Sequence, residues 1–228
     1  EFRNIQGYSG EGRSAIMVWH FSENLTIQRN RIINCDRGIT LGLPGSQLDG
    51  GRHVTNALVR NNFILPGCKA GYTSDAGIEC SDVDNVKIYH NTIWRLNNDY
   101  NGRGTRFIQN IANTEMVNNL VYGRLVFDNN LTISRNEHNL SGNLPAGIVA
   151  NASAGDLHLT TAATDAINKG VKLSQVTEDF DKSARDANPD IGADEVASQQ
   201  NPTPTPTATP TAKPTPEPTP PSGGSTPP

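Results

Sequence analysis

One pattern of asparagines constrains this chain of 228 residues more than any other feature. An asparagine, two residues, an apolar residue, two residues and a second asparagine recur at residues 24–30, 56–62, 85–91, 113–119 and 130–136. The first four copies start 28 to 32 residues apart, and the fifth starts 17 residues after the fourth. Between the asparagines the side chains alternate, so that Val86 and Ile88 point to one side and Lys87 to the other. The pattern predicts short strands with one apolar face.

Such a strand is not stable alone, but stacked copies can bury their apolar sides and pair their backbones with the coils above and below. Asparagine suits the corners because it tolerates left-handed backbone and its amides form ladders at the strand spacing. The chain holds 25 asparagines, a surplus that this use explains. An antiparallel sandwich is the alternative, but its hairpin loops do not require asparagines at matching positions. We therefore expect an all-β, single-stranded parallel solenoid.

Further segments carry a family resemblance. They are residues 38–42 (Gly-Ile-Thr-Leu-Gly), 156–159, 166–170, 179–181 and 190–195 (Asp-Ile-Gly-Ala-Asp-Glu). Together with the asparagine repeats, they resemble a right-handed parallel β-helix of the pectate-lyase-like superfamily, of the secreted bacterial type, over about residues 10–196. The resemblance implies β-helix coils in residues 1–155, without the N-terminal cap of the family, and an irregular closing segment in residues 156–196. We interpret the chain as the C-terminal part of such a protein.

Residues 197–228 have a different composition, in which proline and threonine alternate. Of the 15 prolines, 11 lie beyond residue 200, so this stretch cannot bury apolar surface and is expected to be a disordered, extended linker. We read it as an extracellular spacer leading to a further module or anchor, with a plain disordered tail as the alternative. The predicted location is therefore secreted or cell surface.

Charge and hydropathy exclude two classes of partner. The 19 basic and 23 acidic residues argue against nucleic acid, and no run of 18 apolar residues predicts a membrane span. The resemblance implies instead a polysaccharide partner and a lyase or glycoside hydrolase acting on acidic polysaccharide. The alternative is a non-catalytic, adhesin-like glycan-binding or structural module, and the sequence does not decide whether the chain is an enzyme.

The repeat also predicts which residues share the outer face of neighbouring coils. One outward column holds Thr26, Leu58, Lys87, Glu115 and Thr132, and its neighbour holds Gln28, Arg60, Tyr89, Val117 and Ser134. β-Elimination needs a base and a cation that neutralises the uronate carboxylate. We therefore predict Lys87, Arg60 and His90 as catalytic residues, and Tyr89 and Glu115 as substrate-binding residues. The alternative is an ordinary solvated sheet face of mixed charge.

No metal ligands are assigned, although the resemblance makes calcium a candidate. The acidic residues around one strand, Asp75, Glu79, Asp82 and Asp84, are interpreted as a solvated turn. Cys35 and Cys68 should lie on adjacent coils within disulfide distance, with buried free thiols as the alternative, and the pairing of Cys80 is left open. Trp19 and Trp94 are expected to serve packing, His20 is expected at a corner, and His158 has no predicted partner.

Overall fold

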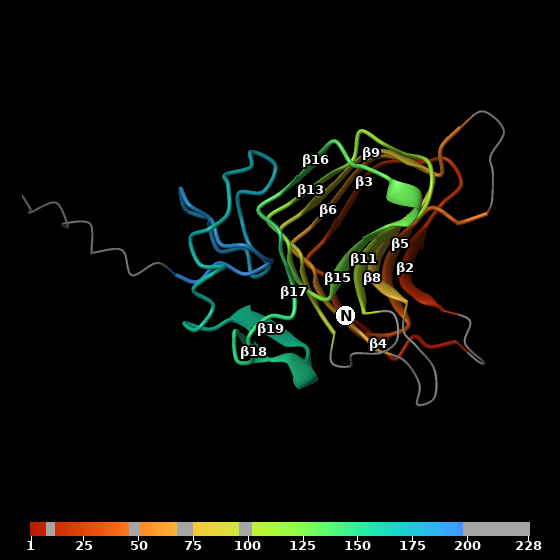
Figure 1. The fold of residues 1–228 in the computed structure, drawn as a ribbon. Helices are drawn as coiled ribbons and strands as arrows, with labels where there is room; N and C mark the ends of the chain where they lie inside the picture. Colours follow the sequence, from red (N-terminus) through yellow and green to blue (C-terminus); the bar gives the residue numbers. More distant parts are fainter. Residues whose placement is uncertain (8–11, 46–50, 68–74, 96–101, 198–228) are drawn as a thin grey trace, which may run out of the picture. The chain divides into compact units, whose positions relative to one another are not determined.

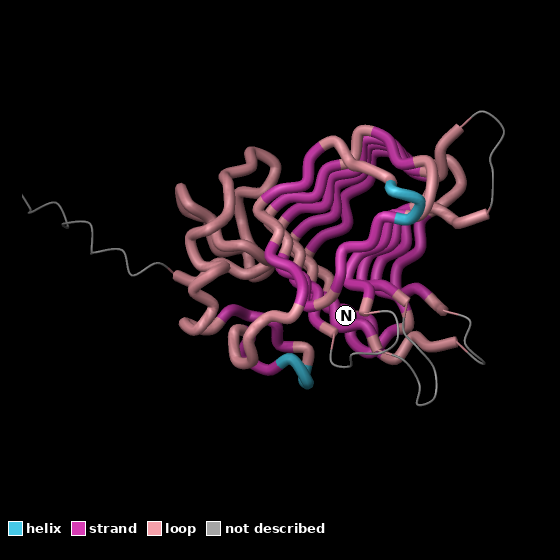
Figure 2. Tube along the Cα trace, viewed as in Figure 1, coloured by secondary structure: helices cyan, strands magenta, loops and turns pink. Residues whose placement is uncertain are grey.

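The computed structural model describes residues 1–7, 12–45, 51–67, 75–95 and 102–197. The chain separates into two units, residues 1–196 and 197–228, and the strands of the described residues belong to the first unit. Cys68 and nearly all of the Pro/Thr-rich stretch lie outside the described residues. The fold is all-β, as predicted, and is built mainly from parallel strands that the chain visits in three sheets in turn. Figures 1 and 2 show these sheets as stacked layers of strands.

The three sheets are named A, B and C, and their bounds are as follows. Sheet A contains β1 (Phe2–Arg3), β4 (Arg31–Cys35), β7 (Phe63–Pro66), β10 (Thr92–Trp94), β14 (Leu120–Tyr122) and β17 (Leu140–Gly142). Sheet B contains β2 (Ser14–Val18), β5 (Arg37–Leu41), β8 (Ala76–Cys80), β11 (Arg103–Phe107) and β15 (Arg124–Phe127). Sheet C contains β3 (Ser22–Gln28), β6 (Val54–Arg60), β9 (Val83–Tyr89), β13 (Glu115–Val117) and β16 (Arg135–Glu137), and β12 (Ile111–Ala112) also pairs with β9.

After the stacked sheets, the chain forms an antiparallel pair, β18 (Val149–Asn151) and β19 (Asp156–Leu159). The helical elements of the described residues are two 3-10 turns, η1 (Asp128–Asn130) and η2 (Ala152–Ala154). Residues 160–196 then run without further strands. This order of parallel strands, followed by a less regular end, is compatible with a parallel β-helix.

The apolar residue at the centre of each repeat forms the core. Ile27, Val59, Ile88 and Met116 lie opposite one another on successive strands of sheet C, and each is buried. Burying a side chain of this size contributes about 1.5–3 kcal/mol. The predicted alternation is therefore correct for the first four repeats, and so are both outward columns over these coils.

The second asparagine of each repeat forms what we call the inner asparagine ladder. Each side-chain Nδ2 donates to the Oδ1 of the next member at 2.8–3.0 Å, in the order Asn30, Asn62, Asn91, Asn119 and Asn139. The same Oδ1 atoms also accept from the backbone N–H of the preceding member, and the Nδ2 groups of the three central members donate to two backbone carbonyls each. These three central amides are completely buried, so their groups depend on each other for hydrogen bonds.

Left-handed backbone occurs at two places in each repeat. The first asparagine adopts it, with φ of 56°, 54°, 51° and 45° at Asn24, Asn56, Asn85 and Asn113. At the second corner, however, the left-handed residue precedes the ladder asparagine, in the series Arg29, Asn61, His90, Asn118 and His138. The predicted left-handed backbone is thus confirmed at the first asparagine, and the predicted amide ladder is confirmed at the second. The second asparagine acts through its side chain.

The fifth repeat is shifted from its predicted register. Arg135, and not Thr132, lies opposite Glu115, and Glu137, and not Ser134, lies opposite Val117. Asn139, and not Asn136, occupies the fifth position of the ladder, because its Oδ1 accepts from the backbone N–H and the side chain of Asn119. The segment between these coils is short and contains several asparagines, so the pattern at residues 130–136 matches the repeat without occupying its position.

The ladder predicts a specific loss of stability. We expect Asn91→Ala to lower the free energy of unfolding by about 2–3 kcal/mol, because it leaves buried donors and acceptors of two neighbouring coils without partners. Urea denaturation followed by circular dichroism measures this loss. Thr26→Ala, on the exposed side of β3, serves as the control and should change stability by less than about 0.5 kcal/mol. Equal effects of the two substitutions would contradict the role of the ladder.

Candidate functional site

A groove crosses the outer face of sheet C. It has a volume of about 320 Å³ and is lined by Asn24, Leu25, Thr26, Asn56, Ala57, Leu58, Asn85, Lys87 and Gln175. Three of these are the exposed first asparagines of the repeats, and their amides form an outer row. Asn56 donates to Asn24 at 3.3 Å, and Asn85 donates to Asn56 at 2.7 Å. The groove therefore presents stacked amides from three coils and one lysine side chain.

Two of the predicted residues lie at or beside this groove. Lys87 lines it and is half-buried. The Arg60 guanidinium donates to Gln28 Oε1 at 2.8 Å and also to the backbone carbonyl of Gln175. Arg60 thus holds a groove-lining residue of the C-terminal segment in place.

Tyr89 and Glu115 form a pair that is turned away from solvent. The Tyr89 hydroxyl donates to Glu115 Oε2 at 2.5 Å, and the Tyr89 side chain is 2% exposed. Its ring belongs to a small apolar cluster with Val117, Leu173 and Val176. Burial, followed by the hydrogen bond to Glu115, raises the pKa of Tyr89 above its ordinary value. A sugar ring has no access to the buried face of Tyr89, so the predicted stacking contact does not fit this geometry.

His90 is also buried, and the expectation that it faces solvent is wrong. Its Nδ1 lies 3.1 Å from the carbonyl oxygen of Asp190 and 3.2 Å from that of Gly192, and its Nε2 lies 2.8 Å from Asn118 Nδ2. Since carbonyls only accept, we assign the proton to Nδ1, and Nε2 accepts from Asn118. Burial, and then the charge of Arg185, lower the pKa of His90 well below 6.5. The neutral ring is used for hydrogen bonding, and its predicted catalytic role finds no support in these contacts.

His90 is one member of a series that we call the docking column, which consists of Arg29, Asn61, His90, Asn118 and His138. These are the left-handed residues beside the inner ladder, and each contacts the backbone of the C-terminal segment. The partners, in the same order, are the backbone carbonyls of Asp179, Glu178, Asp190 (and Gly192), Val171 and Lys169, at 2.6–3.2 Å. The C-terminal segment therefore covers one edge of the predicted site, and this explains the burial of Tyr89 and His90.

A second group of charged residues lies on sheet B, which we call the arginine–carboxylate cluster. It comprises Arg37, Asp75, Glu79, Arg103, Arg106 and Asp128. Arg37 donates through Nε and Nη2 to Asp75 at 2.9 and 2.5 Å, and Arg103 reaches the other oxygen of Asp75 at 2.9 Å. Arg106 binds Asp128 in the same forked manner at 3.0 and 2.6 Å. The sequence predicted that Asp75 and its acidic neighbours lie in a solvated turn. This prediction is wrong for Asp75, because two arginines bind its carboxylate.

Glu79 differs from its neighbours because it is completely buried and neither carboxylate oxygen has a hydrogen-bond partner. Arg37 and Arg106 lie 3.7 and 3.9 Å away, which is beyond hydrogen-bond distance. Burial raises the pKa of Glu79, despite the opposing charge of Arg37. Burial acts on Asp75 in the same direction, but hydrogen bonds from Arg37 and Arg103 outweigh it and lower the pKa of Asp75. Two carboxyl groups whose pKa values are shifted in opposite directions within one cluster are an arrangement used in acid–base catalysis.

A signal for this cluster is present in the sequence. Glu79 lies six residues ahead of Asn85 and Arg106 lies seven ahead of Asn113, and the structure pairs the two residues directly. Alternation along β8 places Glu79 between the inward Ile78 and Cys80. The remaining acidic residues are also engaged, since Asp82 pairs with Arg52 at 3.2 Å and Asp84 accepts from Asn113 at 2.8 Å. These contacts do not form the oxygen-rich cage that calcium requires.

The structure also settles several smaller predictions. Cys35 and Cys80 are buried free thiols, which agrees with the free-thiol alternative and not with a disulfide at Cys35, while Cys68 lies outside the described residues. Trp94 packs against Tyr122 with ring centroids 4.7 Å apart, as expected, whereas Trp19 is 44% exposed. His20 lies at a corner with a left-handed backbone.

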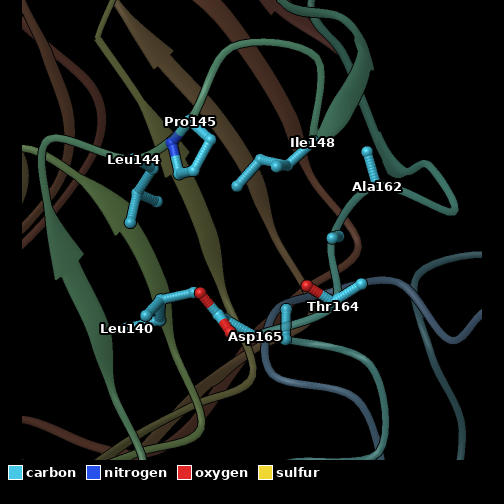
Figure 3. Close-up of a pocket in the computed structure, with 9 residues that line it drawn as sticks. Leu140, Leu144, Pro145, Ile148, Ala162, Thr164 and Asp165 are labelled. Atoms are coloured by element: carbon cyan, nitrogen blue, oxygen red, sulfur yellow. The ribbon is translucent and has the colours of Figure 1, made fainter.

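A further pocket, shown in Figure 3, is small and mainly apolar. Its volume is about 60 Å³, and its lining is formed by Leu140, Leu144, Pro145, Ile148, Ala162, Ala163, Thr164, Asp165 and Ala166. Asp165 and Thr164 contribute the ionisable and hydroxyl groups of this lining. The size and polarity of this pocket do not suit a polysaccharide.

Comparison with known proteins gives no family assignment. No protein-family model matches the chain, and no curated protein matches it. Within the described residues, no helix has the length and apolar character needed to cross a membrane.

The neutral state of His90 predicts a pH dependence of stability. Because the pKa of His90 is lowered on folding, the unfolded chain binds a proton more readily once the pH falls below about 6.5. This contribution to stability is present above that pH and is lost as the pH decreases. We expect the stability of the wild type relative to His90→Asn to fall by about 1 kcal/mol between about pH 6.5 and 5.5.

Asparagine is the appropriate replacement because Asn61 and Asn118 occupy equivalent left-handed positions. Urea unfolding of both proteins at each pH provides the measurement. An unchanged difference between the two proteins over this range would show that His90 does not fold in its neutral form.

Proposed function

We propose that this chain is a secreted or cell-surface right-handed parallel β-helix protein, similar to the pectate-lyase-like superfamily, that binds acidic polysaccharide in the groove of sheet C. The proposal rests chiefly on one observation, the groove of about 320 Å³ that combines an amide row with Lys87. The order of the three parallel sheets and the asparagine ladder support the β-helix assignment. The Pro/Thr-rich composition of the last 30 or so residues supports an extracellular location.

The chemistry of the groove suits a chain of sugars that carry carboxylates. Amide groups both donate and accept, so the outer row can pair with sugar hydroxyls in either direction. Asn24, Asn56 and Asn85 lie on adjacent strands, so these groups repeat at about 4.8 Å along the stack. The ammonium group of Lys87 supplies a cation for a uronate carboxylate. A repeating ligand can contact the same side-chain type on each of these coils.

Affinity electrophoresis in gels containing polygalacturonate tests this proposal, with a neutral glucan gel as the reference. We expect the wild type to be retarded by the acidic polymer only, and Lys87→Ala to weaken binding about tenfold by loss of a charged contact. Asn56→Gly, which keeps the left-handed backbone accessible, should also weaken binding. Lys169→Ala, an exposed lysine outside the groove lining, should bind as the wild type does. Equal binding by Lys87→Ala, Lys169→Ala and wild type would rule out the groove.

A second candidate function is cleavage of the polysaccharide at the arginine–carboxylate cluster. It is favoured by the opposite pKa shifts of Glu79 and Asp75, which suit a proton donor and a base. The arginines around them are suited to a uronate carboxylate. The burial of Glu79 requires that this face opens to admit substrate.

Product release from polygalacturonate tests the second candidate, followed by ultraviolet absorbance for a lyase and by reducing ends for a hydrolase. If the cluster is catalytic, Glu79→Gln should reduce the rate by about 10²–10⁴-fold while leaving retardation in the gel unchanged. No product from the wild type, together with intact binding, would identify a binding module and reject the enzyme.

A further inference from the structure

Three separate stretches of the C-terminal segment bring a histidine and two carboxylates together. His158 lies on β19, Asp181 follows 23 residues later, and Asp194 lies near the end of the described residues. One ligand atom from each of the three side chains lies within 4.8 Å of the other two. None of these residues belongs to the groove or to the arginine–carboxylate cluster.

The His158 ring is held in a fixed orientation. It packs edge-on against Phe63, with centroids 4.9 Å apart and an interplanar angle of 88°, and against Phe180 at 6.0 Å. Its Nδ1 contacts Asp156 Oδ1, two residues away on the same strand. Its Nε2 therefore points toward Asp181, at 2.7 Å from Oδ2. A metal-binding histidine usually has a carboxylate on one ring nitrogen, as Asp156 is here, and its other nitrogen beside the remaining ligands, as Nε2 is beside Asp181.

Basic side chains act on this position only from a distance, since the charge of Arg31 lowers the pKa of Asp156 without a direct ion pair. In the described part of the chain, Asp156, Asp181 and Asp194 form no ion pair with lysine or arginine, so the one imidazole faces three carboxylates. Asp194 is only 7% exposed, and its Oδ2 accepts from the backbone N–H of Leu159 at 2.7 Å. A nearly buried carboxylate that lies close to a second carboxylate and an imidazole is an arrangement that a cation would stabilise.

We propose that His158 Nε2, Asp181 and Asp194 bind a divalent transition metal of the zinc class, with Asp156 orienting the imidazole. One nitrogen and two carboxylate oxygens are a ligand set that zinc accepts, and three protein ligands leave a coordination position for water. Calcium and magnesium are less suited, because both prefer oxygen ligands throughout. The metal would join residues 158, 181 and 194, and so fasten β19 to the last turns of the segment.

Metal binding to the full chain tests this site. The protein is stripped with EDTA, in a Cys68→Ser background to remove a competing thiol, and titrated with Zn²⁺ by calorimetry at neutral pH. We expect one site per chain and a rise in Tm of roughly 5–10 °C at a hundredfold excess over Kd. Replacement of Zn²⁺ by Co²⁺ should give a visible absorption band, a readout that a purely structural salt bridge does not produce.

The variants separate the possible outcomes. Asp181→Asn is preferred because the Asp181 side chain is 53% exposed and its loss leaves the fold intact, and it should abolish both the Tm rise and the cobalt band. His158→Ala should do the same, whereas His138→Ala, at a histidine outside the cluster, should bind as the wild type does. No Zn²⁺-dependent signal, an equal response to Ca²⁺, or full binding by Asp181→Asn would overturn the proposal. In the first case His158 would be a protonated clamp between Asp156 and Asp181.

Discussion

The structure depends on hydrogen bonds between buried asparagine side chains. An amide buried in an apolar interior is costly unless its donors and acceptors are all paired, and here each coil supplies the partners of the next. Asn62, Asn91 and Asn119 have no exposed surface, and their side chains also hold backbone groups at the corner between sheets C and A. The hydrophobic interior alone would tolerate a coil of a slightly different register. The ladder does not, because a displaced amide would lose several partners together, and so it aligns the whole stack.

The corner that contains the ladder also places the C-terminal segment. The residue before each ladder asparagine adopts left-handed backbone and turns its side chain outward, where it contacts the backbone of residues 169–192. Arg185 adds a buried connection, since it donates to Asn61 and to the carbonyl of Gly192. The corner therefore has an inner side that sets the register and an outer side that receives the rest of the chain. The C-terminal segment leaves part of the outer face of sheet C exposed, and the groove with Lys87 lies on this exposed part.

Local sequence was sufficient for the strands of the first four repeats, because alternation and asparagine spacing are visible within seven residues. It failed at the fifth repeat, where Asn139 takes the ladder position although Asn136 fits the pattern better. For the candidate site, the outward columns were predicted correctly over the first four coils, but the burial of Tyr89 and His90 was not predicted. Their covering residues lie about 80 to 100 positions further along the chain, in a segment with no periodic pattern. Glu79 was misread because its arginine neighbours come from β5 and β11, and only the stacking brings them together.

The docking column has a consequence for how this protein reaches its native state. Arg29 hydrogen-bonds the carbonyl of Asp179, 150 residues away, and Asn61 reaches Glu178 across 117 residues. Contacts of such separation carry a large loop-closure cost and are associated with slow folding. The side chains of the docking column are aligned only after successive coils have stacked. The C-terminal segment therefore docks late in folding, onto coils that are already correctly assembled. During synthesis the coils emerge from the ribosome first, and the docking column stays exposed until residues 169–192 have been synthesised.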